Sequence, residues 1–184
     1  MAEYYLISQL PSLDGLGDNA PLPITDERFT ELCERFLGKK ALRDMKNITL
    51  APTFELENAH SALINSWNDG ERNLRLALCK ARAEKMHKSF EMPKNDLPQE
   101  LLKTAYAAVE IKNPLDAELF LLRYRLGFLE SLRPMDGFSD EYVFYYALKL
   151  KLLSRIKGFD AAIGEETYKN IYDSILGGDL SEAK

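Results

Sequence analysis

The sequence predicts an all-α protein, a multi-helix bundle of about six to seven helices with a central helix at about 113–133. This central segment has two apolar stripes at helical spacing, whereas a surface helix needs only one. The first stripe consists of Leu115, Leu119, Leu122, Leu126 and Leu129. The second stripe consists of Ala117, Leu121, Tyr124, Phe128 and Leu132. Because both stripes require packing, we expect this helix to lie between other helices and to be the part of the chain most devoted to burial.

The N-terminal third begins with the segment that is hardest to assign. Residues 4–7 (Tyr-Tyr-Leu-Ile) favour a strand, yet no second strand-like run exists to pair with them, so any β structure is confined to this segment. Residues 8–24 hold three prolines and a Gly-Leu-Gly pair and are predicted to form a loop. Thr25 is the expected N-cap of an amphipathic helix that Gly38 stops, and a short helix is predicted at 40–46.

A long helical region is predicted at 57–89. The sequence Asn68-Asp69-Gly70 inside it is a turn signal, so the region is either one helix or two helices that meet there. One helix is favoured, because the apolar face keeps its phase across the glycine. Asp96 is then expected to cap a helix that carries Leu101, Leu102, Ala105, Tyr106 and Val109.

The C-terminal third has clear helix boundaries. Asn113 as N-cap and Pro114 as the first helical residue begin the central helix, and Pro134 ends it. Ser139 is expected to cap a helix with a nearly continuous apolar face, which Gly158 closes.

The last residues are predicted to contain one more amphipathic helix, carrying Tyr168, Ile171, Tyr172, Ile175 and Leu176, and the tail at 177–184 is expected to fray. The chain has 184 residues, enough for one domain with a real core, so residues 1–184 are predicted to form a single helical domain.

Composition and charge narrow the class of protein. Hydrophobic residues make up 46% and charged residues 29%, which is typical of a soluble globular chain. The net charge of −5 argues against a protein that binds nucleic acid through its overall charge. No run reaches the roughly 18 apolar residues that a membrane span requires, and Glu3 stands where a secretory signal would be basic. We therefore expect a cytoplasmic protein, with Cys33 and Cys79 as small core residues outside any disulfide.

The search for chemical motifs yields no catalytic residue, cofactor site or metal site. Phosphate-binding loops, zinc-protease motifs, nucleophile elbows and Cys-x-x-Cys pairs are all missing from the sequence. The pair Gly15 and Gly17 lacks the third glycine and the strand–helix setting of a dinucleotide loop. His60 and His87 lie far apart in one helical region, and no dense group of acids surrounds either.

Three arginines form the one polar group that could serve a function. Arg72, Arg75 and Arg82 fall within a narrow arc of the predicted long helix, in an otherwise acidic protein. They either pair along a helix seam with acids such as Asp116 and Glu130, or they bind an acidic partner surface. Nucleic acid fits less well, because exposed aromatic residues are not interleaved with the basic ones.

Four segments resemble a known family. They are residues 4–11 (YYLISQLP), 67–75 (Trp-x3-Glu-Arg-x-Leu-Arg), 113–118 (NPLDAE) and 146–150 (YALKL). Together they look like an uncharacterised bacterial family that is encoded beside V/A-type ATPase subunits and is itself similar to the C-type (in eukaryotes d-type) connector subunit of V-type ATPases. The connector subunit is an all-helical funnel that seats the central stalk on the membrane rotor ring and has no chemistry of its own. The chain has room for only one or two of its three helical units.

The resemblance implies a non-catalytic adaptor that binds the central stalk and the rotor ring at the cytoplasmic face of the inner membrane, and that reaches the membrane only through these partners. Two alternatives stay open. One is a helical protein–protein interaction scaffold unconnected with the ATPase. The other is a bundle that binds a small ligand or acts as an enzyme, which would need a pocket where polar groups converge with a histidine or a cysteine.

Overall fold

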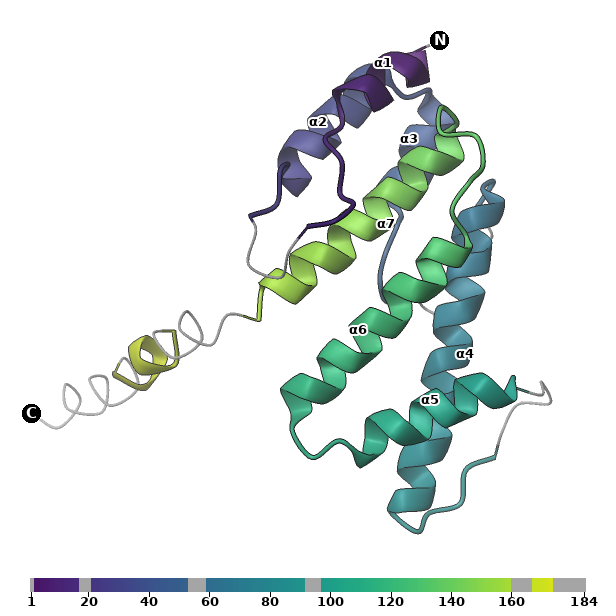
Figure 1. The fold of residues 1–184 in the computed structure, drawn as a ribbon, viewed down its shortest axis with the longest axis vertical. Helices are drawn as coiled ribbons and strands as arrows, with labels where there is room; N and C mark the ends of the chain where they lie inside the picture. The colour runs from purple at the N-terminus through teal and green to yellow at the C-terminus, as the bar shows by residue number, and fades with distance from the viewer. Residues whose placement is uncertain (1, 17–20, 53–58, 92–96, 160–166, 174–184) are drawn as a thin grey trace, which may run out of the picture.

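The computed structural model describes residues 2–16, 21–52, 59–91, 97–159 and 167–173, and the regular structure within these ranges is helical throughout. The all-α prediction is confirmed. The helices in chain order are α1 (Ala2–Gln9), α2 (Asp26–Phe36), α3 (Lys39–Lys46), α4 (Ala62–Lys85), α5 (Gln99–Glu110), α6 (Pro114–Ser131) and α7 (Asp140–Lys157) (Figure 1). Residues 167–173 are also helical. None of the described helices is both long enough and apolar enough to cross a bilayer.

The N-terminal segment, which has strand-favouring residues, is the helix α1. It packs against α2 (Figure 1). Its Leu6 is fully buried, whereas Tyr4 and Tyr5 are exposed. A lone strand would leave its backbone groups unpaired, whereas a helix satisfies them internally and still buries Leu6. The expected loop at 8–24 therefore begins later, after Gln9, and residues 17–20 of it lie outside the described residues.

Capping side chains determine most of the helix boundaries. Thr25 Oγ1 accepts a hydrogen bond from the Arg28 backbone N–H at 3.2 Å and begins α2 as predicted. Ser139 and Asn113 cap α7 and α6 in the same way, and both caps were predicted. By contrast, α5 begins after Pro98 rather than at Asp96, which lies outside the described residues.

The long helix α4 is continuous through Gly70, as the phase of the apolar face predicted. It begins at Ala62 instead of residue 57, after the N-cap Ser61, and the predicted start lies among residues outside the description. A Cβ atom added to Gly70 would lie 2.3 Å from Cε1 of Phe128 on α6. The glycine therefore accommodates the close approach of the Phe128 ring of α6 and does not mark a turn.

This close approach gives a testable prediction. Replacing Gly70 with alanine should lower the free energy of unfolding by about 1–2 kcal/mol, because an overpacking cost of about 2–3 kcal/mol outweighs a gain of about 1 kcal/mol in helix propensity. Urea unfolding of the variant measures the change. In a Phe128→Ala background the same substitution should become neutral or stabilising.

Gly127 on α6 is the matched control, because a Cβ added there meets nothing within 4 Å. Gly127→Ala should raise stability by up to about 1 kcal/mol through helix propensity alone. Equal effects of Gly70→Ala and Gly127→Ala would contradict the close packing of Phe128 on α4.

The described residues form two hydrophobic cores. The first core gathers side chains from α1, α2, α3, α7 and the start of α4, including Trp67. The second core lies between the end of α4 and α5, and includes Leu74. Helix α6 contributes to both, with Leu122 in the first core and Leu121 in the second. The prediction of a two-sided central helix is therefore confirmed, although Phe128 and Leu132 of its second stripe pack against the first core.

The most deeply buried helix is α7, not α6 as expected. Residues 143–150 of α7 are buried without interruption, because α7 contacts α3, α4 and α6. Figure 1 shows α7 running between the N-terminal helices and α6. On α6, Leu115 is exposed and Leu126 is only partly buried.

The two cysteines differ in environment. Cys33 is buried in the first core, as expected, and burial raises the pKa of its thiol to about 12. Cys79 is exposed on α4, so the prediction that it belongs to the core is wrong. Both are free thiols. Near the C-terminus, Tyr168, Ile171 and Tyr172 of the helical stretch 167–173 are exposed, and residues 174–184, which include the predicted tail, lie outside the described residues.

Candidate functional site

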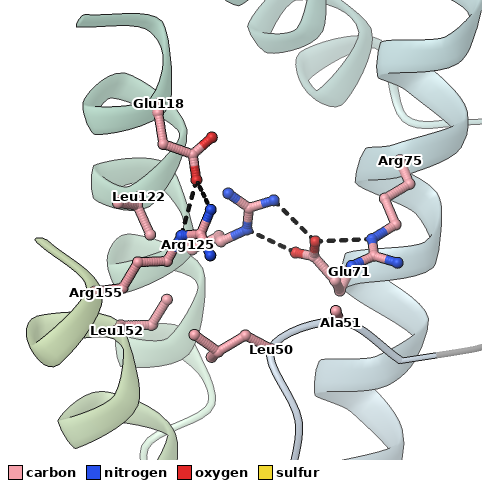
Figure 2. A pocket seen from close by; sticks show the side chains of 9 residues that line it. All are labelled: Leu50, Ala51, Glu71, Arg75, Glu118, Leu122, Arg125, Leu152 and Arg155. Atoms are coloured by element: carbon pink, nitrogen blue, oxygen red, sulfur yellow. Dashed lines mark hydrogen bonds and ion pairs between the residues drawn. The ribbon is translucent and has the colours of Figure 1, made fainter. Parts of the chain in front are cut away.

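A pocket of about 210 Å³ lies where α4, α6 and α7 meet the segment that follows α3 (Figure 2). Its apolar wall consists of Leu50, Ala51, Leu122 and Leu152. Its polar lining consists of Glu71 and Arg75 from α4, Glu118 and Arg125 from α6, and Arg155 from α7. The pocket thus brings together five charged side chains from three helices, which no stretch of the sequence groups.

The centre of the site is an ion pair between Glu71 and Arg125. Arg125 Nε donates to Glu71 Oε2 and Arg125 Nη2 donates to Glu71 Oε1, each at 2.9 Å, in a bidentate arrangement. The Glu71 side chain is 1% exposed and that of Arg125 is 14% exposed. Glu71 lies between Trp67 of the first core and Leu74 of the second. The pair therefore joins α4 to α6 at the boundary of the two cores.

Arg75 adds a second contact to the same carboxylate. Its Nε donates to Glu71 Oε1 at 3.2 Å, and its Nη1 donates to the backbone carbonyl of Pro52 at 3.4 Å. Because Arg75 is one turn after Glu71 on α4, this contact lies within a single helix. The bond to Pro52 also ties α4 to the segment that follows α3.

A second ion pair closes the opposite side of the pocket. Arg155 of α7 donates from Nε to Glu118 Oε1 of α6 at 3.0 Å, and its Nη2 lies 2.9 Å from the same oxygen. Figure 2 shows the guanidinium of Arg125 between Glu71 and this Arg155–Glu118 pair. The pair is half exposed, so it is accessible from outside and contributes little to stability.

The electrostatics of the pocket favour permanently charged groups. Burial lowers the pKa of Arg125, but the hydrogen bonds to Glu71 and the charges of Glu71 and Glu118 outweigh it, so the pKa of Arg125 lies above its ordinary value. A guanidinium of this kind stays charged and does not exchange protons at neutral pH. The site can hold an anion and brace helices, but its arginines are poor groups for acid–base chemistry.

The structure separates the three arginines that were predicted to act together. Arg75 lines the pocket, whereas Arg72 pairs with Asp69 through Nη1 and Oδ1 at 3.0 Å, and Arg82 is exposed near the end of α4. The expected pairing along a helix seam with acids of the central helix is not what Arg72 and Arg75 show, because the acids that they bind, Asp69 and Glu71, lie on α4 itself. The expected partners are elsewhere: Asp116 is exposed, and Glu130 binds Lys149.

The histidines and cysteines do not line this pocket. The His60 side chain is 71% exposed, with Nδ1 3.5 Å from Asp44 Oδ2. His87 follows the end of α4 with a positive φ of 54°. Within the part of the chain that the structure describes, histidine, cysteine, aspartate and glutamate side chains do not form a group of three or more that could hold a metal ion.

A second charged group, around the buried Lys149, lies at the edge of the first core, and its two acids are about half exposed. Lys149 Nζ of α7 lies 2.6 Å from Glu130 Oε1 of α6 and 2.5 Å from Asp14 Oδ1 of the loop after α1. Tyr145 Oη also donates to Glu130 Oε1 at 2.7 Å. The bond to Lys149 lowers the pKa of Asp14, and Glu130, despite its partial burial, also has a lowered pKa because it accepts from Lys149 and Tyr145. No sequence pattern indicates this group, because its members are far apart in the chain.

These pKa shifts predict a dependence of stability on pH. A carboxyl group whose pKa is lowered by folding stabilises the protein above its unfolded pKa, and this contribution disappears as the pH falls through the folded pKa. We expect Lys149→Met to cost about 1–2 kcal/mol at pH 7, allowing for the partial exposure of both acids. The cost should be smaller at pH 3 than at pH 7, because protonation of Asp14 and Glu130 in the folded protein begins only as the pH falls toward their lowered pKa values.

Denaturant unfolding at both pH values measures the difference, with Lys151→Met on the same helix as the control. Lys151 is partly buried on α7, and its replacement should cost the same at pH 7 and pH 3. A pH-independent cost for Lys149→Met would contradict the assigned role of Asp14 and Glu130.

No family model, curated protein or solved structure matches this chain.

Proposed function

We propose that this chain is a non-catalytic adaptor subunit of a bacterial V/A-type ATPase, similar to the connector subunit, that links the central stalk to the membrane rotor. The proposal rests on the resemblance of residues 4–11, 67–75, 113–118 and 146–150 to that family, and the all-α fold is compatible with it. In this role the protein would lie at the cytoplasmic face of the inner membrane, which it would reach only through its protein partners.

The observation that carries the proposal is the buried brace between the two cores. A subunit that transmits torque must resist bending where its parts join. The Glu71–Arg125 pair fastens α4 to α6 at that point. Paired, directional bonds of this kind fix the relative position of helices more tightly than apolar contact alone.

The chemistry of the pocket also favours an adaptor over an enzyme. General acid–base catalysis uses groups that exchange protons near neutral pH, whereas this pocket is lined by arginines and by carboxylates already bound to them. At about 210 Å³ the pocket is smaller than the roughly 300–1,000 Å³ that is typical of sites for drug-sized ligands.

Co-expression with the central-stalk and rotor-ring subunits of the same host tests the proposal. We expect the chain to co-purify with them in a fixed ratio and to remain bound in high salt. The variant Arg72→Ala/Arg75→Ala/Arg82→Ala should be retained less. Its melting temperature should fall less than that of Arg125→Met, since the Arg72 and Arg75 ion pairs lie within one helix and Arg125 still holds both oxygens of Glu71.

Loss of the folded state in this triple variant would instead assign the arginines to stability. If the wild-type chain is folded and the subunits assemble without it, the ATPase proposal fails. A helical interaction scaffold with other partners would then be the better description.

A further inference from the structure

We propose that the pocket between α4, α6 and α7 is a docking site for one acidic side chain, a glutamate or aspartate, of a partner protein. This docking site presupposes the proposed adaptor function, which supplies the protein partner. The described pocket already contains its positive groups, an apolar wall and an opening, and it includes Arg75, one of the arginines that the sequence singled out.

The charge of the pocket leaves room for one anion. Its lining carries three arginines against two carboxylates, so a single positive formal charge is uncompensated. A dianion such as a phosphate monoester would reverse the sign of this balance, whereas one carboxylate neutralises it. Partial burial makes this neutralisation more favourable than it would be at an open surface.

The hydrogen bonding of the arginines supports the same ligand. Each guanidinium uses Nε and one Nη group within the protein, and the remaining Nη groups, Nη2 of Arg75 and Nη1 of Arg125 and Arg155, have no acceptor among the described residues. Planar guanidinium forks match the two oxygens of a carboxylate. Arginines from three separate helices that line one pocket thus suit an incoming carboxylate.

The apolar wall suits the rest of an acidic side chain. Leu122 and Leu152 are almost completely buried behind the arginines, and Leu50 lines the pocket with them. The methylene groups of a glutamate could pack on these leucines while the carboxylate contacts the guanidinium groups. The small volume fits a side chain and excludes a nucleotide-sized ligand.

The arginines are held in place before any ligand arrives. Glu71 orients Arg75 and Arg125, and Glu118 orients Arg155, while the Arg155 guanidinium also lies 5.8 Å from the ring centroid of Phe159. Preorganised donors lose less conformational entropy on binding than free side chains do. A partner's carboxylate would therefore complete an existing network and would not have to order a new one.

The first test uses sodium propionate, which reproduces the end of a glutamate side chain, on the full chain labelled with ¹⁵N. We expect saturable shifts of the Nε–Hε signals of Arg125 and Arg155. Propionamide and sodium chloride at equal ionic strength should give no such saturation. Arg155→Gln should weaken propionate binding about tenfold, the loss expected for one hydrogen bond to a charged group. Shifts that do not saturate, or that chloride reproduces, would overturn the proposal.

The second test asks whether the ligand belongs to a partner. Arg155→Gln should reduce retention on the stalk and rotor subunits, whereas Arg123→Gln, an exposed arginine on α6 outside the pocket, should not. Equal retention of both variants, with propionate still saturating the pocket, would assign the site to free carboxylates and overturn docking.

The two tests also separate this inference from the adaptor proposal. If the wild-type chain is retained on the ATPase subunits but does not bind propionate, the adaptor proposal stands and the docking proposal fails. If the chain binds propionate but is not retained, the adaptor proposal fails, and docking of acidic side chains from the ATPase subunits fails with it.

Discussion

Replacing Arg125 with methionine is expected to lower the free energy of unfolding by about 3–5 kcal/mol, the largest effect of any single charge in the described structure. The substitution keeps much of the side-chain volume but removes both hydrogen bonds to Glu71, whose side chain is 1% exposed. Arg75 holds only one oxygen of that carboxylate and is itself 38% exposed, so it cannot replace the bidentate pair. Urea unfolding followed by circular dichroism measures the loss.

A double-mutant cycle identifies the cause of that loss. The variant Glu71→Leu/Arg125→Met removes the buried charge together with its partner, and it should be more stable than Arg125→Met alone by about 1–3 kcal/mol. Arg123→Met is the control, because Arg123 is exposed on the same helix and its replacement should cost about 0.5 kcal/mol or less. If Arg125→Met lowers the free energy of unfolding no more than Arg123→Met does, water reaches Glu71 and the Glu71–Arg125 pair does not stabilise the contact between α4 and α6.

The helix boundaries could be predicted because their signals are local. Thr25, Asn113 and Ser139 each cap a helix by accepting a hydrogen bond from a backbone N–H two or three residues ahead. Such a bond depends on the residues around it and on little else. The continuity of α4 through Gly70 could be predicted for a related reason, since the phase of an apolar face is visible in the sequence.

The features that the sequence did not reveal depend on how the helices pack. Residues 4–7 have side chains that favour strands, but the burial of Leu6 against the other helices outweighs that weak preference. The residue through which α4 forms an ion pair with another helix could not be derived from the sequence either. Glu71, rather than an arginine, is the charged residue of α4 that pairs with α6, because the acid lies on the buried side of α4.

One signal could have indicated the site. Glu71 falls in phase with Trp67, Leu74 and Leu78 on the apolar face of α4, where an unpaired acid would be costly. A charge in that position requires a buried cation from another helix. Arg125 satisfies the same condition on α6, since it follows Leu121 and Leu122 by one turn and is flanked by residues that pack on both cores.

Replacing Leu122 with alanine is the second change with a large expected effect, a loss of about 2–5 kcal/mol. Leu122 is 1% exposed, belongs to the first core and forms part of the pocket wall, so truncation leaves a cavity that rigid neighbouring helices cannot fill. Leu126, one turn later, is only partly buried. Its replacement should cost about half as much, because folding removes a smaller apolar area of this side chain from contact with water.

The comparison of these two leucines tests where α6 is anchored. Leu115, at the exposed N-terminal end of the same helix, is the control, and Leu115→Ala should cost about 0.5 kcal/mol or less. Thermal and urea unfolding of the three variants should therefore rank them Leu122, Leu126, Leu115 in order of decreasing loss. A small loss at Leu122 would show that α6 packs loosely where the two cores meet. The Glu71–Arg125 pair would then be the main connection between them, and Arg125→Met should separate their unfolding into two transitions.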